Sequence, residues 1–217
     1  MSMDKAFLFD MDGVLIDTER EWAASQASLE NIFGKDIVGK MGDMVGLTIK
    51  TEYEKAVGMG FALSYEEYVK RYDQEAVRVF EKARVTEGVN ELGEKLLELD
   101  FKLAIVSSSR RAWINFLLPK LSFGDKFDQI ISLDDYPELK PKPAPDGYLE
   151  ALKSLRIDPK RSIILEDSNR GIQSAKAAGA YVVGFKGNLG EDYRQEGADV
   201  YANTMAEVAT IVESLRL

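Results

Sequence analysis

The chain of 217 residues contains no cysteine and no histidine. Without cysteine, disulfides, thiolate nucleophiles and cysteine metal sites are excluded, and a cytoplasmic location is expected. Without histidine, the commonest general base and the commonest transition-metal ligand are missing as well. Acid–base chemistry must therefore fall to carboxylates, lysine, tyrosine or serine. A metal bound through oxygen alone would be a hard cation, magnesium or calcium rather than zinc.

Positive charge is also scarce, because 28 Lys and Arg residues face 37 Asp and Glu residues, which gives a net charge of -9. An acidic surface disfavours general binding to nucleic acid or to an anionic membrane, although a local pocket can still be positive. The apolar run at residues 6–9 is too short for a signal sequence, and no stretch approaches the length of a membrane span. We therefore expect neither a nucleic-acid nor a membrane partner.

Short apolar runs predict strands that are buried on both faces, at residues 6–9, 102–106, 129–132, 162–165 and 181–183. The segments between these runs have the spacing of apolar residues that is typical of helices. Strands that alternate with helices predict a parallel α/β sheet. Residues 17–84 contain no such run, but carry capping-box patterns at 18–21 and 64–67. The sequence thus predicts an α/β core, residues 1–15 and 85–217, and an inserted helical cap, residues 16–84.

The first segment that carries chemistry is Asp10-Met11-Asp12-Gly13, at the end of the first predicted strand. Ligands of open parallel sheets bind outside the carboxyl ends of the strands, so both carboxylates would lie at the functional edge. One of them can attack a substrate while the other handles protons, and a magnesium ion can be shared between them. A simple turn explains the same pattern about equally well.

Two further segments follow later strands. Ser107, Ser108 and Ser109 come directly after one of them, where hydroxyls and backbone amides suit phosphate oxygens, although capping of the next helix is the simpler explanation. Lys140 and Lys142 lie in a proline-rich string whose stiff backbone would fix an ammonium group against a phosphate or a carboxylate. A rigid surface loop with solvated lysines is the alternative.

The fourth segment is Glu166-Asp167, at the end of another predicted strand. Carboxylates near a core cost several kcal/mol unless a partner compensates them. A divalent cation would supply that compensation. Capping of the following helix by Asp167 or Ser168 is the alternative explanation. We favour the metal, because two acids are more than a cap needs.

Taken in this order, the segments and the helical insertion resemble the haloacid dehalogenase-like superfamily, in particular the branch of β-phosphoglucomutase and the sugar-phosphate phosphatases. The resemblance covers nearly the whole chain and implies a Rossmann-like three-layer core with an all-helical, C1-type cap. It implies that Asp10 is a nucleophile that forms an aspartyl-phosphate and that Asp12 is the acid and base. Ser107 would bind the phosphoryl group and Lys142, which alone continues the family pattern through Asp146, would supply the counter-charge.

The same resemblance implies a Mg²⁺ site formed by Asp10, the backbone carbonyl of Asp12, and Asp167. Glu166 would support this site, either linked to the metal through water or as a neighbour of its ligands. Ser108 and Ser109 would lie on the substrate side. Asp12 also argues against the dehalogenases and phosphonatases of the superfamily, which do not keep an aspartate there.

One departure from the family pattern bears on the reaction. Phosphoglucomutases of this branch carry a histidine in the cap, a few residues after the segment that corresponds to Asp17-Thr18, whereas this chain has Trp22 in that region and no histidine at all. The resemblance thus favours a phosphatase over a sugar phosphomutase. Its substrate would be a small phosphorylated metabolite, with a sugar phosphate as the favoured class. Trp22 would be a wall of the substrate pocket or a core residue of the cap. Gly46 and Thr48 would face substrate or simply connect helices. Members with this cap type are often monomers, and we expect the same here.

Overall fold

The computed structural model describes residues 4–42, 44, 46–190 and 192–215, and its centre is a six-stranded sheet. The strand order is β3-β2-β1-β4-β5-β6, and every neighbouring pair is parallel. The strands are β1 (Lys5–Phe9), β2 (Phe101–Ser107), β3 (Gln129–Ser132), β4 (Ser162–Glu166), β5 (Tyr181–Phe185) and β6 (Val200–Ala202). The predicted parallel α/β sheet is confirmed. β6 was not predicted, because a three-residue edge strand gives no apolar run long enough to recognise.

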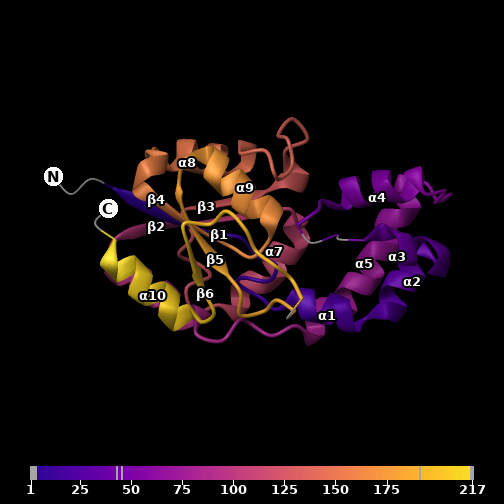
Figure 1. Ribbon diagram of the computed structural model, residues 1–217, viewed down its shortest axis with the longest axis horizontal. Coiled ribbons are helices and arrows are strands. Elements are labelled where there is room, and N and C mark those ends of the chain that lie inside the picture. The colour runs from indigo at the N-terminus through magenta and orange to yellow at the C-terminus, as the bar shows by residue number, and fades with distance from the viewer. Residues whose placement is uncertain (1–3, 43, 45, 191, 216–217) are drawn as a thin grey trace.

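Helices cover both faces of the sheet, which gives the three layers that Figure 1 shows. One face packs against α6 (Val89–Glu98), α7 (Arg111–Leu117) and α10 (Met205–Ser214), and the other against α8 (Asp146–Leu155) and α9 (Asn169–Ala178). Strand β1 shows why both faces are covered: Phe7 and Phe9 enter the first cluster, while Ala6 and Leu8 enter the second. Alternate side chains of a strand point to opposite faces, so a wholly apolar strand needs a layer on each side. Short 3-10 turns complete the core: η1 (Leu118–Lys120), η2 (Leu133–Asp135) and η3 (Pro159–Arg161).

A separate group of helices, which we call the cap helices, lies beyond the sheet edge at the right of Figure 1. They are α1 (Thr18–Ala24), α2 (Gln26–Phe33), α3 (Lys35–Met41), α4 (Ile49–Gly58) and α5 (Tyr65–Lys82). They have an apolar cluster of their own, which includes Ile32, Phe33 and Tyr68. The predicted capping box at the start of α5 forms, with Ser64 and Glu67 bonded to each other's backbone N–H. At the start of α1 the prediction was one residue late, because Asp17 is the cap.

Two chain segments connect the core to the cap helices, and they run side by side. The amide N–H of Asp17 donates to the carbonyl of Arg84 at 2.9 Å, and that of Thr86 donates to the carbonyl of Leu15 at 3.0 Å. The side-chain amide of Asn188 donates to the carbonyl of Gly13 at 3.1 Å. These bonds pin the connections beside the end of β1, so the cap helices are held over the sheet edge where β1 terminates.

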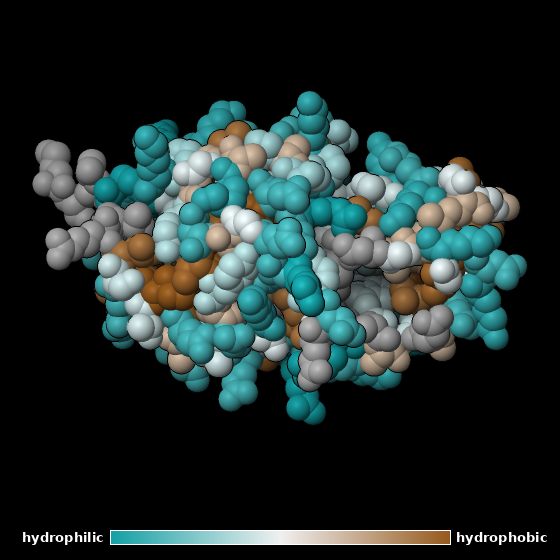
Figure 2. Space-filling view, in the orientation of Figure 1, coloured by the Kyte–Doolittle hydropathy of each residue, from teal (hydrophilic) through white to brown (hydrophobic). Residues whose placement is uncertain are grey.

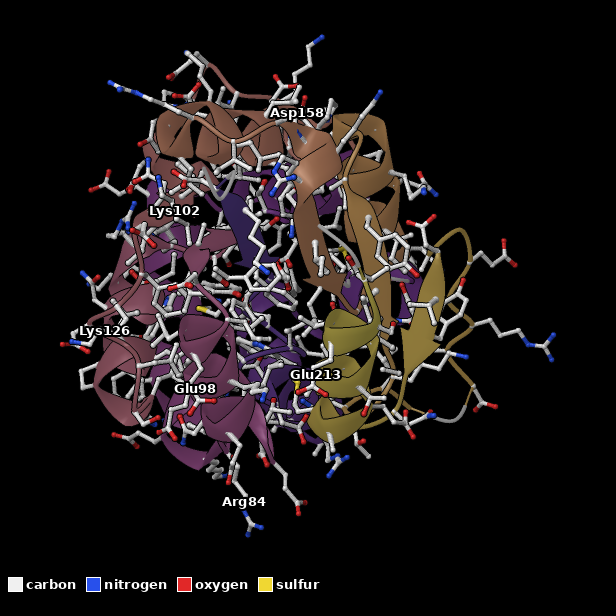
Figure 3. The ribbon with its side chains drawn as sticks, turned by 90° about the vertical axis from the view of Figure 1, so that its left-hand side faces the viewer. Arg84, Glu98, Lys102, Lys126, Asp158 and Glu213 are labelled. Carbon is white, nitrogen blue, oxygen red and sulfur yellow. The ribbon has the colours of Figure 1, made fainter. Side chains whose placement is uncertain are left out.

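The surface is mostly hydrophilic in the view of Figure 2, with only small apolar patches. At the end remote from the cap helices, charged side chains such as Lys126, Asp158 and Glu213 project outward (Figure 3). Among the described residues, no helix has both the length and the apolar character needed to cross a membrane.

Candidate active site

Asp10 and Lys142 form a buried ion pair at the carboxyl end of β1. Asp10 directly follows Phe9, and its amide N–H donates to the carbonyl of Leu165 in β4 at 3.0 Å. The Nζ of Lys142 lies 2.6 Å from Asp10 Oδ1, and both residues are less than a tenth exposed. Lys140, by contrast, is exposed. The proline-rich loop thus delivers Lys142, not Lys140, to the end of the sheet.

Glu166 holds Lys142 in place from the other side. Its Oε1 accepts hydrogen bonds from Lys142 Nζ at 2.5 Å and from the Tyr148 hydroxyl at 2.6 Å. Its Oε2 accepts from the Ser168 hydroxyl at 3.3 Å. Glu166 is fully buried, and there is little room around it, because a Cβ added to Gly171 would lie 1.9 Å from its Oε1. Lys142 therefore sits between two carboxylates, and this arrangement raises its pKa even though burial alone would lower it.

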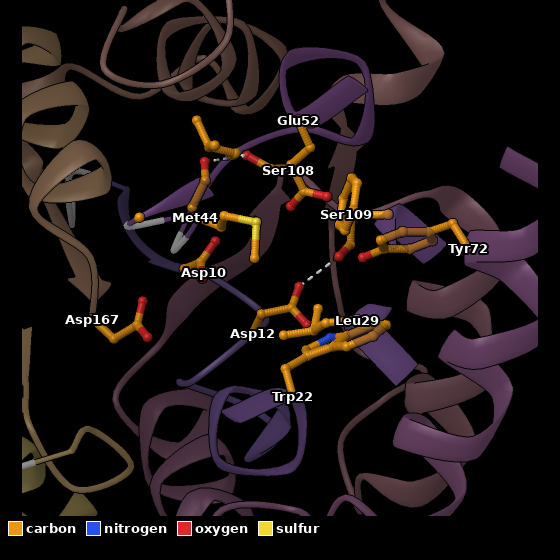
Figure 4. Close-up of a pocket in the computed structure, with 14 residues that line it drawn as sticks. Asp10, Asp12, Trp22, Leu29, Met44, Glu52, Tyr72, Ser108, Ser109 and Asp167 are labelled. Carbon is orange, nitrogen blue, oxygen red and sulfur yellow. Dashed lines mark hydrogen bonds between the residues drawn. The ribbon is translucent and has the colours of Figure 1, made fainter. Parts of the chain in front are cut away.

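Asp12 is held by two hydroxyl groups from different parts of the chain. Thr18 Oγ1, at the start of α1, donates to Asp12 Oδ1 at 2.7 Å. Ser109 Oγ, after β2, donates to Asp12 Oδ2 at 2.6 Å (Figure 4). Burial raises the pKa of Asp12 above its usual value, and the bonds from Ser109 and Thr18 offset part of that rise. A carboxyl that is held in place and has a raised pKa is suited to giving and taking a proton.

The residues around Asp10 fit a hard divalent cation. Asp10, Glu166 and Asp167 each place one carboxylate oxygen within 4.8 Å of the others. Burial raises the pKa of Asp10 to about 8, the charge of Lys142 counteracts this, and the neighbouring Glu166 and Asp12 raise it further. A cation among these oxygens would favour the charged form of Asp10. Only oxygen donors are present in this group, which suits magnesium or calcium. Both oxygens of Glu166 also accept hydrogen bonds, from Lys142 and Tyr148 on one and from Ser168 on the other.

A cavity of about 290 Å³ opens above these carboxylates, between the sheet edge and the cap helices. Figure 4 shows Asp10, Asp12 and Asp167 on one side of it, with Trp22 and Tyr72 of the cap helices close to Asp12 and Ser109. The volume is that of a small-molecule site. The carboxylates of Asp10 and Asp12 thus line a cavity of this size, and the ammonium group of Lys142 is bonded to Asp10.

Some of the other predicted site residues line this cavity and others do not. Trp22, Gly46, Ser108 and Ser109 line it, and the Ser108 hydroxyl donates to the Gly46 carbonyl at 3.3 Å. Ser107 is fully buried and does not line the cavity. Its Oγ accepts a hydrogen bond from the Ser109 amide at 2.9 Å.

Thr48 does not line the cavity either, because its hydroxyl caps α4 by accepting from the Thr51 amide. The roles that the family resemblance implies for Ser107 and Thr48 stay predictions.

Several residues of the site were not found from the sequence. Thr18 was interpreted only within a helix-capping pattern, and Tyr148 was not singled out among the residues between the predicted strands. Tyr148 does lie in the core, but its hydroxyl reaches Glu166. Glu52 and Tyr72 line the cavity from the cap helices. For Tyr148, the sequence did contain one usable signal: a tyrosine among the apolar residues of a helix is expected to be buried, and a buried phenol hydroxyl needs a hydrogen-bond partner.

Comparisons with known proteins show which family the chain belongs to. The family model for haloacid dehalogenase-like hydrolases matches residues 7–185. Hexitol phosphatase B of Escherichia coli (strain K12) is 30% identical over 182 residues, which are 80% of this chain and 79% of that protein. Phosphoglycolate phosphatase of Colwellia psychrerythraea is 29% identical over 220 residues, covering 94% of this chain and 95% of that protein.

A solved structure shares the fold over nearly the whole length. The β-phosphoglucomutase of Clostridium difficile superposes with a TM-score of 0.77 at 24% identity, over 97% of this chain and 96% of that one. The family match covers most of the chain, including all the segments that build the site. The chain therefore belongs to the haloacid dehalogenase-like hydrolase family.

Proposed function

We propose that the chain is a magnesium-dependent phosphatase that hydrolyses a small phosphorylated metabolite, with a sugar phosphate as the favoured substrate class. The observation that carries this proposal is the buried Asp10–Lys142 pair beside Asp12, at the base of the cavity. Its relatives include a hexitol phosphatase and a phosphoglycolate phosphatase, so phosphate monoesters of small alcohols are the natural substrates to test first.

The reaction begins with attack of an Asp10 carboxylate oxygen on phosphorus. The bond from phosphorus to the alcohol oxygen breaks, Asp12 gives its proton to that oxygen, and the phosphoryl group remains on Asp10 as an acyl phosphate. Asp12 then takes a proton from water, which attacks the phosphorus and releases phosphate from Asp10. Thr18 and Ser109 keep the Asp12 carboxyl oriented for both transfers.

Lys142 fixes one oxygen of Asp10 and adds a positive charge beside the phosphoryl group. Asp10, the backbone carbonyl of Asp12, and Asp167 would hold the magnesium ion. When bound, that ion offsets the negative charge of the carboxylates and of the transferring phosphoryl group. The cap helices enclose the cavity and limit the access of water while the phosphoryl group moves to Asp10.

The proposal is tested with a generic aryl phosphate. The wild-type protein should release phosphate in a magnesium-dependent manner, and Asp10→Asn should not. Full activity of Asp10→Asn would overturn the nucleophile assignment. Asp36→Asn, a change of an exposed acid on α3, is the matched control and should behave as wild type.

A sugar phosphomutase is the second candidate, because it would use the same core residues. It would need a group that handles protons on the returning sugar phosphate, and the cap histidine that the family resemblance assigns to this work is absent from the sequence. Activation by a bisphosphorylated sugar, with isomerised product, would favour the mutase. Simple release of phosphate favours the phosphatase.

A further inference from the structure

One acidic residue of the cap helices enters the cavity, and the mechanism above does not use it. Glu52 lies in the first turn of α4 and lines the cavity, near Ser108 and Met44 in the view of Figure 4. The hydroxyl of Tyr68, from α5, donates to Glu52 Oε2 at 3.0 Å. Tyr68 is itself fully buried in the cluster of the cap helices. The carboxyl of Glu52 is therefore held in a fixed position, not free on the surface.

Much of the cavity wall is apolar. Trp22, Leu29, Phe33 and Tyr72 all line the cavity, and the ring of Trp22 packs 5.4 Å from that of Tyr72. Among the described residues that line the cavity there is no lysine or arginine. Lys142 does not line the cavity but bonds to Asp10, which does, and both Asp10 and Glu166 engage its ammonium group. The half of the cavity that would receive the alcohol part of a substrate thus offers hydrogen-bonding and apolar contacts but no positive charge.

We propose that Glu52 and these walls select the charge of the leaving group: the site accepts phosphate monoesters of neutral polyhydroxylated alcohols and rejects esters that carry a second phosphate or a carboxylate. This inference rests on the proposed phosphatase function and narrows its substrate class. The phosphoryl group is the only part of the substrate that meets a cation, at Lys142.

The physical reason is the cost of burying an unpaired charge. A second anionic group would lose water against aromatic rings, would find no lysine or arginine among the described residues that line the cavity, and would be repelled by Glu52 when its carboxyl is ionised. A sugar or polyol hydroxyl, in contrast, donates to Glu52 when the carboxyl is ionised and can also accept from it when it is protonated. The apolar CH groups of the same alcohol pack against Trp22 and Tyr72.

The test measures kcat/KM for a hexitol monophosphate, the corresponding hexitol bisphosphate and phosphoglycolate, with para-nitrophenyl phosphate as the common reference. For the wild type, the monophosphate should exceed each of the other two natural esters by about tenfold or more. Glu52→Lys should reduce this preference by about tenfold or more, because it places a cation where the second anion would lie. Glu52→Gln should reduce the preference for the monophosphate by a smaller factor. This second variant provides the test if Glu52→Lys does not fold.

Glu54→Lys is the matched control, because Glu54 lies on the same helix and is exposed. It makes the same change in net charge and should leave the preference as in the wild type. Equal use of monophosphate and bisphosphate by the wild type, or an unchanged preference in both Glu52 variants, overturns the inference. Absence of magnesium-dependent release of phosphate from para-nitrophenyl phosphate by the wild type would instead overturn the proposed function.

Discussion

Gly171 offers a sharp test of how the buried ion pair is held. It lies in the first turn of α9, and a Cβ added there would lie 1.9 Å from Glu166 Cδ and Oε1 and 2.0 Å from Oε2. These distances are far inside van der Waals contact. Glu166 cannot move away without losing its bonds to Lys142 and Tyr148. Gly171→Ala should therefore displace Glu166 and, with it, the ammonium that fixes Asp10.

The magnitude follows from two opposing effects. Alanine in place of glycine favours the helix by about 1 kcal/mol at most. Disrupting a buried charge pair costs about 3 to 5 kcal/mol. We therefore expect Gly171→Ala to lower the free energy of unfolding by about 2 to 4 kcal/mol and kcat/KM by about 100-fold or more, since small displacements at the reacting group have effects of this size.

Urea unfolding followed by circular dichroism measures the loss of stability. Gly39→Ala is the control, because Gly39 lies in α3 and an added Cβ there meets no atom within 4 Å. It should be neutral or slightly stabilising. In a Glu166→Ala background the clashing carboxylate is gone, so Gly171→Ala should cost nothing there. An equal cost in both backgrounds, or wild-type stability of the single variant, would refute the reasoning.

Further predictions concern the neighbouring charges. Lys142→Met should lower the free energy of unfolding at neutral pH by about 3 to 5 kcal/mol in urea titrations, because it leaves two buried acids without their cation. In single turnovers, Asp12→Asn should slow formation of the acyl phosphate from an alkyl phosphate by about 10² to 10⁴-fold but its formation from an aryl phosphate much less, since an aryl leaving group needs no proton; equal losses in this step would contradict the assignment. Burial raises the pKa of Glu52 to about 8, above its usual 4.5, so the folded state binds its proton more tightly than the unfolded chain does. The contribution of Glu52 to stability is therefore lost as pH rises between these values, and in urea titrations the free energy of unfolding of Glu52→Gln should rise relative to that of the wild type by up to about 1.4 kcal/mol per pH unit. Asp73→Ala, which removes the partly exposed ion pair between α5 and Arg110, should change the free energy of unfolding by less than about 1 kcal/mol.

The layered fold could be predicted because its central strands are apolar on both faces. Residues 6–9 and 162–165 enter both apolar clusters of the core, so their runs of apolar residues are a direct consequence of burial. The third strand of the prediction, residues 129–132, also matches β3. The edge strand β6 has only three residues, and its pairing with β5 depends on contacts that sequence periodicity does not encode.

The base of the site was also accessible from sequence, since acids at strand ends converge at one edge of a parallel sheet. The side chains that orient these acids were not. Thr18 lies at the start of a helix in the cap and Ser109 lies after β2, yet both donate to Asp12. Such bonds join residues whose separation in the chain says nothing of their distance in space. The same holds for Glu52, whose place in the cavity depends on how the cap helices lie over the sheet.

The central claim is that the phosphoryl group passes through Asp10, and chemical trapping tests it most directly. The enzyme is quenched during turnover of a slow phosphate ester with magnesium present, treated with borohydride and digested for mass spectrometry. An acyl phosphate on Asp10 is reduced by borohydride to homoserine, so we predict homoserine at position 10 in the wild type and none in Asp10→Asn or in wild type without substrate. Phosphate release without homoserine at position 10, or with the modified residue at Asp12 instead, would contradict the account.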